Sequence, residues 1–181
     1  MAHFDSGGPN NTITKKVLFV PFAAAGDVCD VKVLRSRTSF AEGTIERIVT
    51  PSPDRVEPRC EHFGVCGGCK WQHVPYSVQL DFKQQQVMDA LTRIGKVELP
   101  ECTPIDGSRD IWNYRNKLEF TFSNKKWLTF EEIASGVQYD DMNALGFHIP
   151  NCFDKVLDIK KCWLQDGIYN RLRLDIRAFA I

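Results

Sequence analysis

The sequence lacks both long apolar runs and an excess of charge of either sign. No stretch of its 181 residues approaches the roughly eighteen apolar residues that a membrane-spanning helix needs. The N-terminal MAHFDSGGPNN also lacks the basic and then apolar pattern of a secretory signal, so we expect a cytoplasmic protein with no membrane segment. Lys plus Arg and Asp plus Glu number 23 each. This balance neither requires nor excludes a nucleic-acid partner, because phosphate binding depends on where the basic residues cluster.

Cysteine, in contrast, is frequent and clustered. The chain has seven cysteines, an odd number, so a fully paired disulfide framework would leave one thiol over. In a reducing cytosol, clustered thiols more often hold a metal than a disulfide. The stretch CEHFGVCGGCKWQH spaces Cys60, Cys66 and Cys69 as C-x5-C-x2-C. Gly67 and Gly68 remove side-chain bulk between the last two, so that backbone N–H groups can approach sulfur.

Three interpretations of this loop compete. Inert reduced thiols would be prone to oxidation when three of them lie near solvent in one loop. A structural zinc site needs a tetrahedron of donors, but zinc ribbons usually present two C-x2-C pairs and this loop offers only one. An iron–sulfur cluster, with three ligands on one loop and a fourth from far along the chain, fits the spacing best.

The fourth thiol must come from one of the cysteines outside the loop. Cys29 lies within a strand pattern and is expected to be a small buried hydrophobe. Cys102 and Cys152 follow turn sequences, where they could be exposed and incidental. Cys162 follows the strand candidate VLDIKKC, whose end is a firm place from which to direct a ligand. We therefore expect Cys162 to complete the set.

The apolar patterns predict an α+β fold with two domains. The first domain, residues 1–58, is expected to be a small antiparallel β-barrel. Its short strands are expected at residues 17–22, 28–34 and 41–49. Residues 50–59 contain three prolines and read as a linker. The second domain, residues 59–181, is expected to be α/β in texture with antiparallel strands.

Helical and strand patterns alternate in this second domain. A helix is predicted over residues 77–94, and Gly95 can close it in the left-handed conformation. Asp166 could cap a last helix. One side of that helix carries four apolar residues, namely Ile168, Leu172, Ile176 and Phe179. Strands are predicted at residues 116–123, 144–149 and 155–159.

Several stretches together carry a resemblance to a known family. They are CEHFGVCGGCKWQ, the preceding PSPDRVEPR, and the later YRNKLEFTFS and GFHIPNCFDKVLDIKKCWL. From about residue 17 to the C-terminus, the chain resembles the S-adenosylmethionine-dependent RNA uracil-C5 methyltransferases that modify ribosomal and transfer RNA. The cysteine motif is the most specific part of this likeness.

The resemblance implies an architecture and a cofactor. In that family a TRAM domain, an oligonucleotide-binding (OB) type β-barrel, precedes a central domain that holds a [4Fe-4S] cluster, and a Rossmann-like domain transfers the methyl group. By motif, the implied cluster ligands are Cys60, Cys66, Cys69 and Cys162. The helix at residues 77–94 resembles the one that, in the family, leaves the central domain to pack on the catalytic domain.

The sequence departs from the family pattern at both ends. DSGGPNNTITKK is a poor version of the Gly-rich strand pair that opens the family barrel, so we expect the barrel to be short of a strand. No strand followed by a Gly-rich turn for S-adenosylmethionine is visible, and no catalytic residue can be assigned. We therefore expect the N-terminal part of an enzyme, monomeric, whose S-adenosylmethionine site lies in a missing catalytic domain. The alternative is a self-contained, non-enzymatic RNA-binding or redox-sensing iron–sulfur or zinc protein.

RNA is the partner that the resemblance implies, and OB-type barrels bind it with basic grooves and exposed aromatic rings. The candidate contacts are basic residues and one amide: Lys32, Arg35, Arg37, Arg115, Asn116, Lys117, Lys125 and Lys126. Each of them could instead be a solvated surface residue, and Arg115 could pair with an acid in the core. Phe40, Trp71 and Trp112 could be packed or stacked on bases.

The missing methyl-transfer machinery generates the first prediction. Residues 1–181 alone should show no saturable binding of S-adenosylmethionine in isothermal titration calorimetry, and no transfer of a labelled methyl group to RNA. Saturable cofactor binding by this chain would contradict the assignment of that site to another domain.

Overall fold

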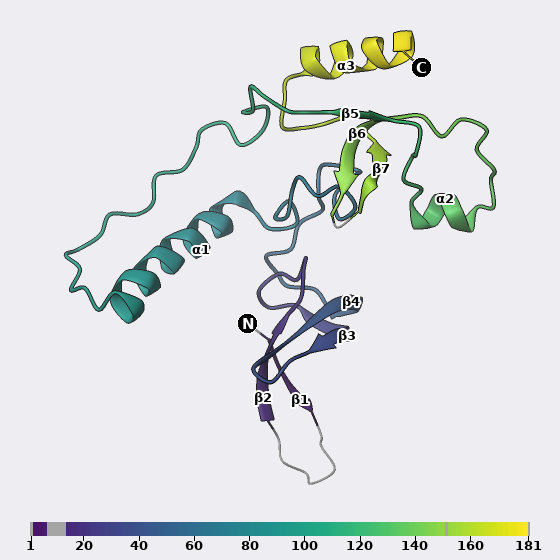
Figure 1. Cartoon of the computed structure of the whole chain (residues 1–181). Coiled ribbons are helices and arrows are strands. Elements are labelled where there is room, and N and C mark those ends of the chain that lie inside the picture. Colours follow the sequence, from purple (N-terminus) through teal and green to yellow (C-terminus); the bar gives the residue numbers. More distant parts are fainter. Residues whose placement is uncertain (1, 7–13, 151, 181) are drawn as a thin grey trace. The chain divides into compact units, whose positions relative to one another are not determined.

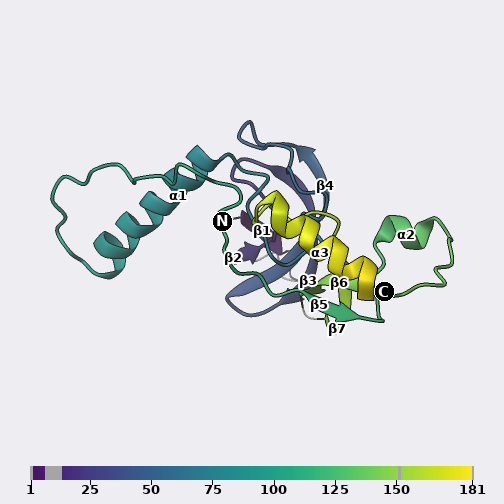
Figure 2. The same ribbon diagram turned by 90° about the horizontal axis from the view of Figure 1, so that it is seen from above.

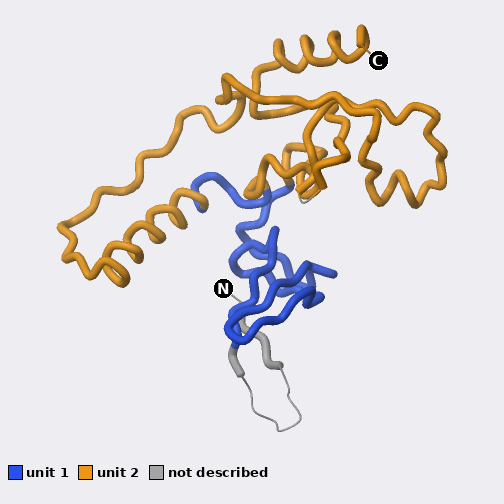
Figure 3. Tube along the Cα trace, in the orientation of Figure 1, with its two compact units in different colours: residues 1–57, 73–78 blue, residues 58–72, 79–181 orange. Residues whose placement is uncertain are grey.

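The computed structural model divides into two compact units (Figure 3). It describes residues 2–6, 14–150 and 152–180. Unit 1 contains residues 1–57 and 73–78, and unit 2 contains residues 58–72 and 79–181. The predicted boundary after residue 58 lies next to the end of the first segment of unit 1. The return of residues 73–78 to unit 1 is a feature that the sequence patterns did not predict.

Unit 1 is built on a four-stranded sheet in the order β1-β2-β4-β3 (Figure 1). The strands are β1 (Ala2–Ser6), β2 (Thr14–Phe19), β3 (Val28–Ser36) and β4 (Phe40–Thr50). β1 pairs with β2 and β3 with β4 in antiparallel fashion, whereas β2 and β4 are parallel. Within the described residues no ladder joins the edge strands β1 and β3, so the sheet is open where a closed antiparallel barrel was predicted.

The individual strands of unit 1 are close to the predictions. β3 and β4 cover their predicted ranges, whereas β2 ends at Phe19 and covers only half of the strand predicted at residues 17–22. The expected shortage of a strand before residue 17 is wrong, because β1 pairs with β2 from Ala2↔Leu18 to Ser6↔Thr14. Residues 7–13, which carry most of the Gly-rich stretch, lie outside the described residues.

A buried ion pair fixes the turn between β2 and β3 to the segment after β4. The Asp27 side chain is 1% exposed, and its oxygens accept hydrogen bonds from the backbone N–H groups of Ala24 (2.7 Å) and Ser52 (2.9 Å). Arg55 donates to the same carboxylate through Nε (3.1 Å) and Nη2 (2.5 Å). The hydrogen bond from Arg55 holds the pKa of Asp27 well below its usual range, although burial opposes this shift. Gly26, with φ +93°, supplies the positive φ that the turn needs.

Unit 2 begins with the cysteine loop and contains all but the first residues of a long helix. Helix α1 (Tyr76–Asp89) continues into a π-helical turn, η1 (Ala90–Ile94), over the range predicted as one helix. The prediction that Gly95 closes this helix in the left-handed conformation is wrong, because its φ is −72° and Lys96 has the positive φ of 52°. The wide π-helical turn moves the reversal by one residue: Gly95 N–H donates to Ala90 O, and Val97 N–H to Leu91 O.

A three-stranded antiparallel sheet and two helices follow in unit 2. The elements are β5 (Thr121–Ser123), β6 (Ala144–Ile149), β7 (Cys152–Asp158), the short helix α2 (Phe130–Ala134) and α3 (Gly167–Ala180). The sheet order is β5-β6-β7, and β5 is much shorter than the predicted strand at residues 116–123. Figures 1 and 2 show α3 crossing over this sheet, and the ion pair of Arg177 with Asp158 (3.0 Å) ties the helix to β7.

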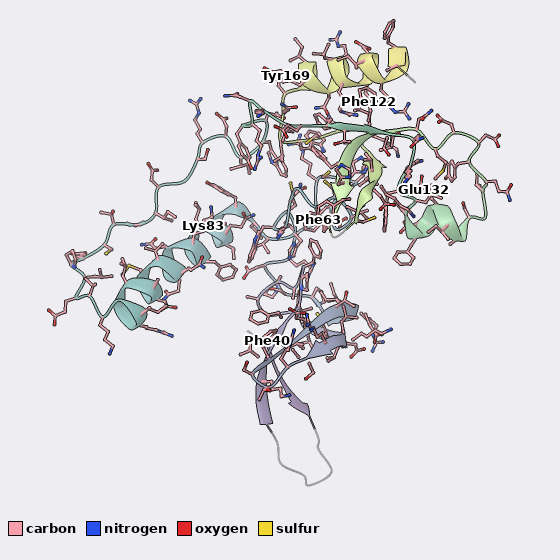
Figure 4. All side chains as sticks on the ribbon, viewed as in Figure 1. Phe40, Phe63, Lys83, Phe122, Glu132 and Tyr169 are labelled. Carbon is pink, nitrogen blue, oxygen red and sulfur yellow. The ribbon has the colours of Figure 1, made fainter. Side chains whose placement is uncertain are left out.

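The packing of α3 differs from the amphipathic pattern of its sequence. Ile168 and Phe179, both on the predicted apolar side, are 68% and 94% exposed. Leu172 and Ile176 are also exposed and border a groove that Phe122 and Tyr169 line as well (Figure 4). The residue of α3 that is buried is Arg173. No helix within the described residues combines the length and apolar character needed to cross a bilayer.

The Asp27–Arg55 pair generates a stability prediction. Asp27→Asn should lower the free energy of unfolding by about 3 kcal/mol, because it leaves Arg55 without its counter-charge. The folded-state pKa of Asp27 lies below the unfolded value of about 3.9. The pair therefore stabilises fully above that pH, and the contribution is lost as the pH falls toward the folded-state pKa. Urea unfolding at several pH values should show this acid-dependent loss in the wild type and its absence in the variant.

Asp30→Asn is the matched control for this prediction. Asp30 pairs with Arg47 on the same sheet, but both side chains are more than half exposed, so the change should cost less than about 1 kcal/mol. Equal destabilisation by the two variants would show that the buried pair has no special role.

Candidate functional site

The loop that carries three of the cysteines is a run of tight turns in unit 2. Phe63 N–H donates to Cys60 O (3.0 Å), and Cys66 N–H donates to His62 O (2.9 Å). Gly64 has φ +87°, a conformation that favours glycine. These turns fold the loop back on itself, so that Cys60 and Cys66 face the same cavity.

Of the two adjacent glycines of the loop, Gly68 brings its N–H to sulfur as predicted, whereas Gly67 makes room for a neighbouring turn. Gly68 N–H donates to Cys66 Sγ at 3.4 Å. A Cβ on Gly67 would lie 2.8 Å from Cγ of Pro150, in the turn between β6 and β7. A larger residue at Gly67 would therefore push the loop away from the sheet.

His62 joins the loop to the segment that carries Cys162. Its imidazole is buried, and its Nε2 accepts a hydrogen bond from the backbone N–H of Lys160 at 3.0 Å. Burial lowers the pKa of His62, which favours the neutral ring that this acceptor role requires. Sequence reasoning missed His62. The only signal was its position between two of the clustered cysteines.

Helix α3 fixes the backbone of Cys162 from the other side. Asn170 Oδ1 accepts from Cys162 N–H (2.8 Å), and Asn170 Nδ2 donates to Cys162 O (2.9 Å). Arg173 donates through Nη1 to Ile159 O and through Nη2 to Lys160 O (2.9 Å). The end of β7 is thus held by side chains one helical turn apart on α3.

The loop and the Cys162 segment enclose one cavity of about 150 Å³. Cys60, Cys66, Cys69 and Cys162 all line it. Apolar and aromatic groups complete the wall, including Phe63 (labelled in Figure 4), Leu118, Phe147, Ile159, Trp163 and Leu164. The structure therefore brings together the four cysteines that the sequence reasoning selected.

The remaining cysteines lie elsewhere. Cys29 is half-buried in β3 of unit 1. Cys102 is exposed, and its thiol donates to Pro100 O at 3.3 Å. Cys152 begins β7, and its thiol donates to Asp154 Oδ1 at 3.2 Å. None of these three lines the cavity.

The surroundings of the cavity change the pKa values of three of its thiols. Burial raises the pKa of the Cys60, Cys66 and Cys162 thiols, and Cys69 raises each of them further. In the absence of a bound group, these thiols are therefore protonated at neutral pH. Binding of a metal or cluster would release their protons, because the thiolate is the ligand.

The donor set fits an iron–sulfur cluster in kind and in number. Thiolates are the usual ligands of such clusters, and four cysteine thiols line this largely apolar cavity. Among the side chains that the structure describes, no group of three or more His, Cys, Asp or Glu is arranged to hold a metal ion.

The predicted RNA contacts are spread over both units. In unit 1, Lys32, Arg35 and Arg37 are exposed on and after β3. In unit 2, Asn116 and Lys125 are exposed, and exposed Lys117 pairs with Glu119 (2.9 Å).

Arg115 and Lys126 have fixed surroundings. Arg115 lines the cysteine cavity, and its N–H donates to Leu164 O at 2.8 Å. Lys126 is half-buried: its ammonium pairs with Glu132 (2.8 Å; Glu132 is labelled in Figure 4) and lies over the ring of Tyr139. Lys126 is therefore engaged within unit 2, whereas Arg115 is exposed at the edge of the cavity.

Of the three aromatic candidates for base stacking, two are packed against other rings and one is open to solvent. Phe40 packs edge-to-face on Phe19, with ring centroids 5.8 Å apart. Trp112 contacts Trp163 in a similar geometry at 6.5 Å. Trp71 is 52% exposed and is the candidate most open to stacking.

Comparison with known proteins places this arrangement in a family. An uncharacterized RNA methyltransferase of Bacteroides thetaiotaomicron is 57% identical over 164 residues, which are 91% of this chain and 36% of that protein. One of Porphyromonas gingivalis is 52% identical over 176 residues, 93% of this chain and 37% of that protein. This chain belongs to the same family as these RNA methyltransferases. It spans about a third of the length of the relatives it matches.

A solved structure shows the same fold. The tRNA (uracil-54, C5)-methyltransferase of Pyrococcus abyssi, in complex with S-adenosyl-L-homocysteine, matches with a TM-score of 0.51 and 24% identity. The match covers 98% of this chain and 36% of the Pyrococcus chain. No family model matches the sequence.

The two hydrogen bonds between the Asn170 side chain and the Cys162 backbone generate a prediction. Asn170→Ala should lower the free energy of unfolding of the metal-free protein by about 1–3 kcal/mol, because it leaves the half-buried N–H and C=O of Cys162 without partners. Hydrogen exchange of the Cys162 amide, followed by NMR, should be faster in the variant. Asn116→Ala, a change at an exposed site, should alter neither quantity. Unchanged exchange in Asn170→Ala would show that these hydrogen bonds do not hold the Cys162 backbone.

Proposed function

We propose that this chain is the RNA-binding and cluster-holding part of an RNA uracil-C5 methyltransferase. The observation that carries the proposal is the identity of 57% to an RNA methyltransferase across 91% of this chain. The fold shared with a tRNA (uracil-54, C5)-methyltransferase supports uracil C5 as the atom that the whole enzyme methylates. Either tRNA or ribosomal RNA fits this proposal as the substrate.

The proposed cofactor of unit 2 is a [4Fe-4S] cluster held by Cys60, Cys66, Cys69 and Cys162. The convergence of these four thiols on one cavity supports it. The cluster would add a covalent link between the loop and the end of β7, which the protein otherwise joins by hydrogen bonds. S-adenosylmethionine would be bound by the part of the relatives that this chain does not span.

Unit 1 is proposed to be a TRAM-like module of the OB type. Its mixed sheet exposes Lys32, Arg35 and Arg37 on and after β3, where a nucleic-acid strand could lie along them. In unit 2, the proposed contacts are the exposed residues Arg115, Asn116, Lys117 and Lys125. A cytoplasmic, monomeric protein follows from this role as a further proposal.

Metal analysis tests the cluster directly. Protein purified without oxygen should contain iron and acid-labile sulfide in equal amounts, about four of each per chain, and should be brown. Cys162→Ser should abolish the colour and most of the iron, since a serine oxygen is a poor substitute for the thiolate. Cys102→Ser and Cys152→Ser, whose thiols lie outside the cavity, are the matched controls and should keep both.

Other results would contradict this assignment in distinct ways. A colourless protein that contains zinc, with the same ranking of variants, would keep the ligand set but exclude the cluster. Iron lost in Cys152→Ser and retained in Cys162→Ser would show that Cys162 is not the fourth ligand.

A further inference from the structure

Two cations beside the cysteine cavity are held by aromatic rings. Cζ of Arg59 lies 3.6 Å from the centroid of the Trp163 ring and 5.3 Å from that of Trp112. Nζ of Lys161 lies 3.7 Å from the Trp163 centroid. Arg59 directly precedes the first cavity cysteine, and Lys161 directly precedes Cys162. Each cation therefore lies next in sequence to a cysteine that lines the cavity.

The charges of these two residues are not neutralised. Within residues 16–150 and 152–180, neither Arg59 nor Lys161 has a carboxylate oxygen within 4.0 Å. The neighbouring Lys160 differs, because its ammonium pairs with Glu61 at 3.0 Å. An aromatic face attracts a cation and fixes its position, but it leaves the full positive charge available. Both side chains are exposed, so an anion can reach them.

Backbone hydrogen bonds within unit 2 fix the positions of the two rings, Trp112 and Trp163, that hold these cations. Asn113 has φ +57°, a conformation that asparagine tolerates better than most residues, and its N–H donates to Trp163 O at 2.9 Å. Two residues later, the backbone N–H of Arg115 bonds to Leu164. The segment thus places Trp112 against Trp163 and sets Arg115 on the wall of the cavity as a third exposed cation.

We propose that Arg59 and Lys161 bind backbone phosphates of RNA at the mouth of the cysteine cavity, with Arg115 extending the site. This proposal rests on the proposed function, since it assigns the RNA contact to particular residues. A guanidinium that stacks on a ring through its face keeps its in-plane N–H donors free for phosphate oxygens. A side chain already held by a ring also loses less conformational freedom on binding. Such contacts position RNA without reading its sequence.

The competing role for the two cations is purely local. Thiolates that hold a cluster carry negative charge, and nearby cations would offset it without touching RNA. This role predicts that removing the cations lowers iron content, whereas the phosphate site predicts that it lowers RNA affinity. The two measurements separate the alternatives.

The test compares two double variants of the anaerobically purified chain. Arg59→Gln with Lys161→Gln removes the ring-held cations. Arg47→Gln with Arg93→Gln removes the same formal charge from residues already paired with Asp30 and Asp89. Fluorescence anisotropy with a labelled RNA hairpin, at several salt concentrations, gives affinity and its salt dependence. Iron per chain and the thermal melt are measured on the same samples.

The phosphate site makes a quantitative prediction. The first variant should bind RNA at least about tenfold more weakly than the wild type at low salt, as expected when hydrogen bonds to charged groups are lost. Its slope of log K against log salt should be shallower by about 1.4 to 1.8, because each lost phosphate contact contributes about 0.7 to 0.9. The control variant should stay close to the wild type in affinity and slope. Iron and thermal melt should be unchanged in both.

Each other outcome overturns the proposal in a recognisable way. If the wild type binds RNA and the first variant binds equally well with the same slope, the site is wrong while the proposed function stands. If the wild type binds no RNA, both fail. Loss of iron with retained RNA affinity assigns the cations to the cluster. Should the double variant not fold, Lys161→Gln alone decides, because an unchanged salt slope in that variant overturns the proposal.

Discussion

The cysteine cavity depends on one hydrogen bond between residues far apart in the chain. Lys160 N–H donates to Nε2 of buried His62 across a separation of 98 positions. Because His62 O also accepts the N–H of Cys66, the same residue shapes the loop and anchors it to the end of β7. From the opposite side, Asn170 and Arg173 fix the following backbone. The protein therefore supplies its own framework for the four thiols, and a bound cluster would reinforce a contact that already exists.

The electrostatic character of the site changes over a short distance. Inside the cavity, burial raises the pKa of the Cys60, Cys66 and Cys162 thiols, which favours their neutral form. At its edge, Arg59, Lys161 and Arg115 are exposed cations without carboxylate partners among the described residues. A ligand that deprotonates the thiols would bring negative charge next to these cations. The proposed cluster and the proposed RNA contacts would therefore influence one another through charge, although different atoms would form them.

Much of the local structure followed from sequence patterns. Sequence patterns located β3, β4 and β6 closely, and apolar spacing located α1 and α3, but β1 and α2 were not predicted. Local sequence patterns did not predict features that depend on packing between segments far apart in the chain. The parallel pairing of β2 with β4 cannot be read from either strand alone. The π-helical turn moved the chain reversal from Gly95 to Lys96. On α3, the apolar side is largely exposed and Arg173 is buried, because carbonyl groups at the end of β7 accept its hydrogen bonds.

The sequence by itself determined the chemistry of the site, because thiol spacing and adjacent glycines are local properties of one loop. It also favoured Cys162 as the distant partner, from its position after a strand. Only the tertiary structure decided that His62 joins the cysteine loop to the end of β7 and that Lys126 forms an ion pair with Glu132. It also decided that two cations lie over the Trp163 ring. These contacts join residues that are distant in sequence or depend on side-chain placement. They form only when the sheet, α3 and the cysteine loop pack together, and no local pattern encodes that packing.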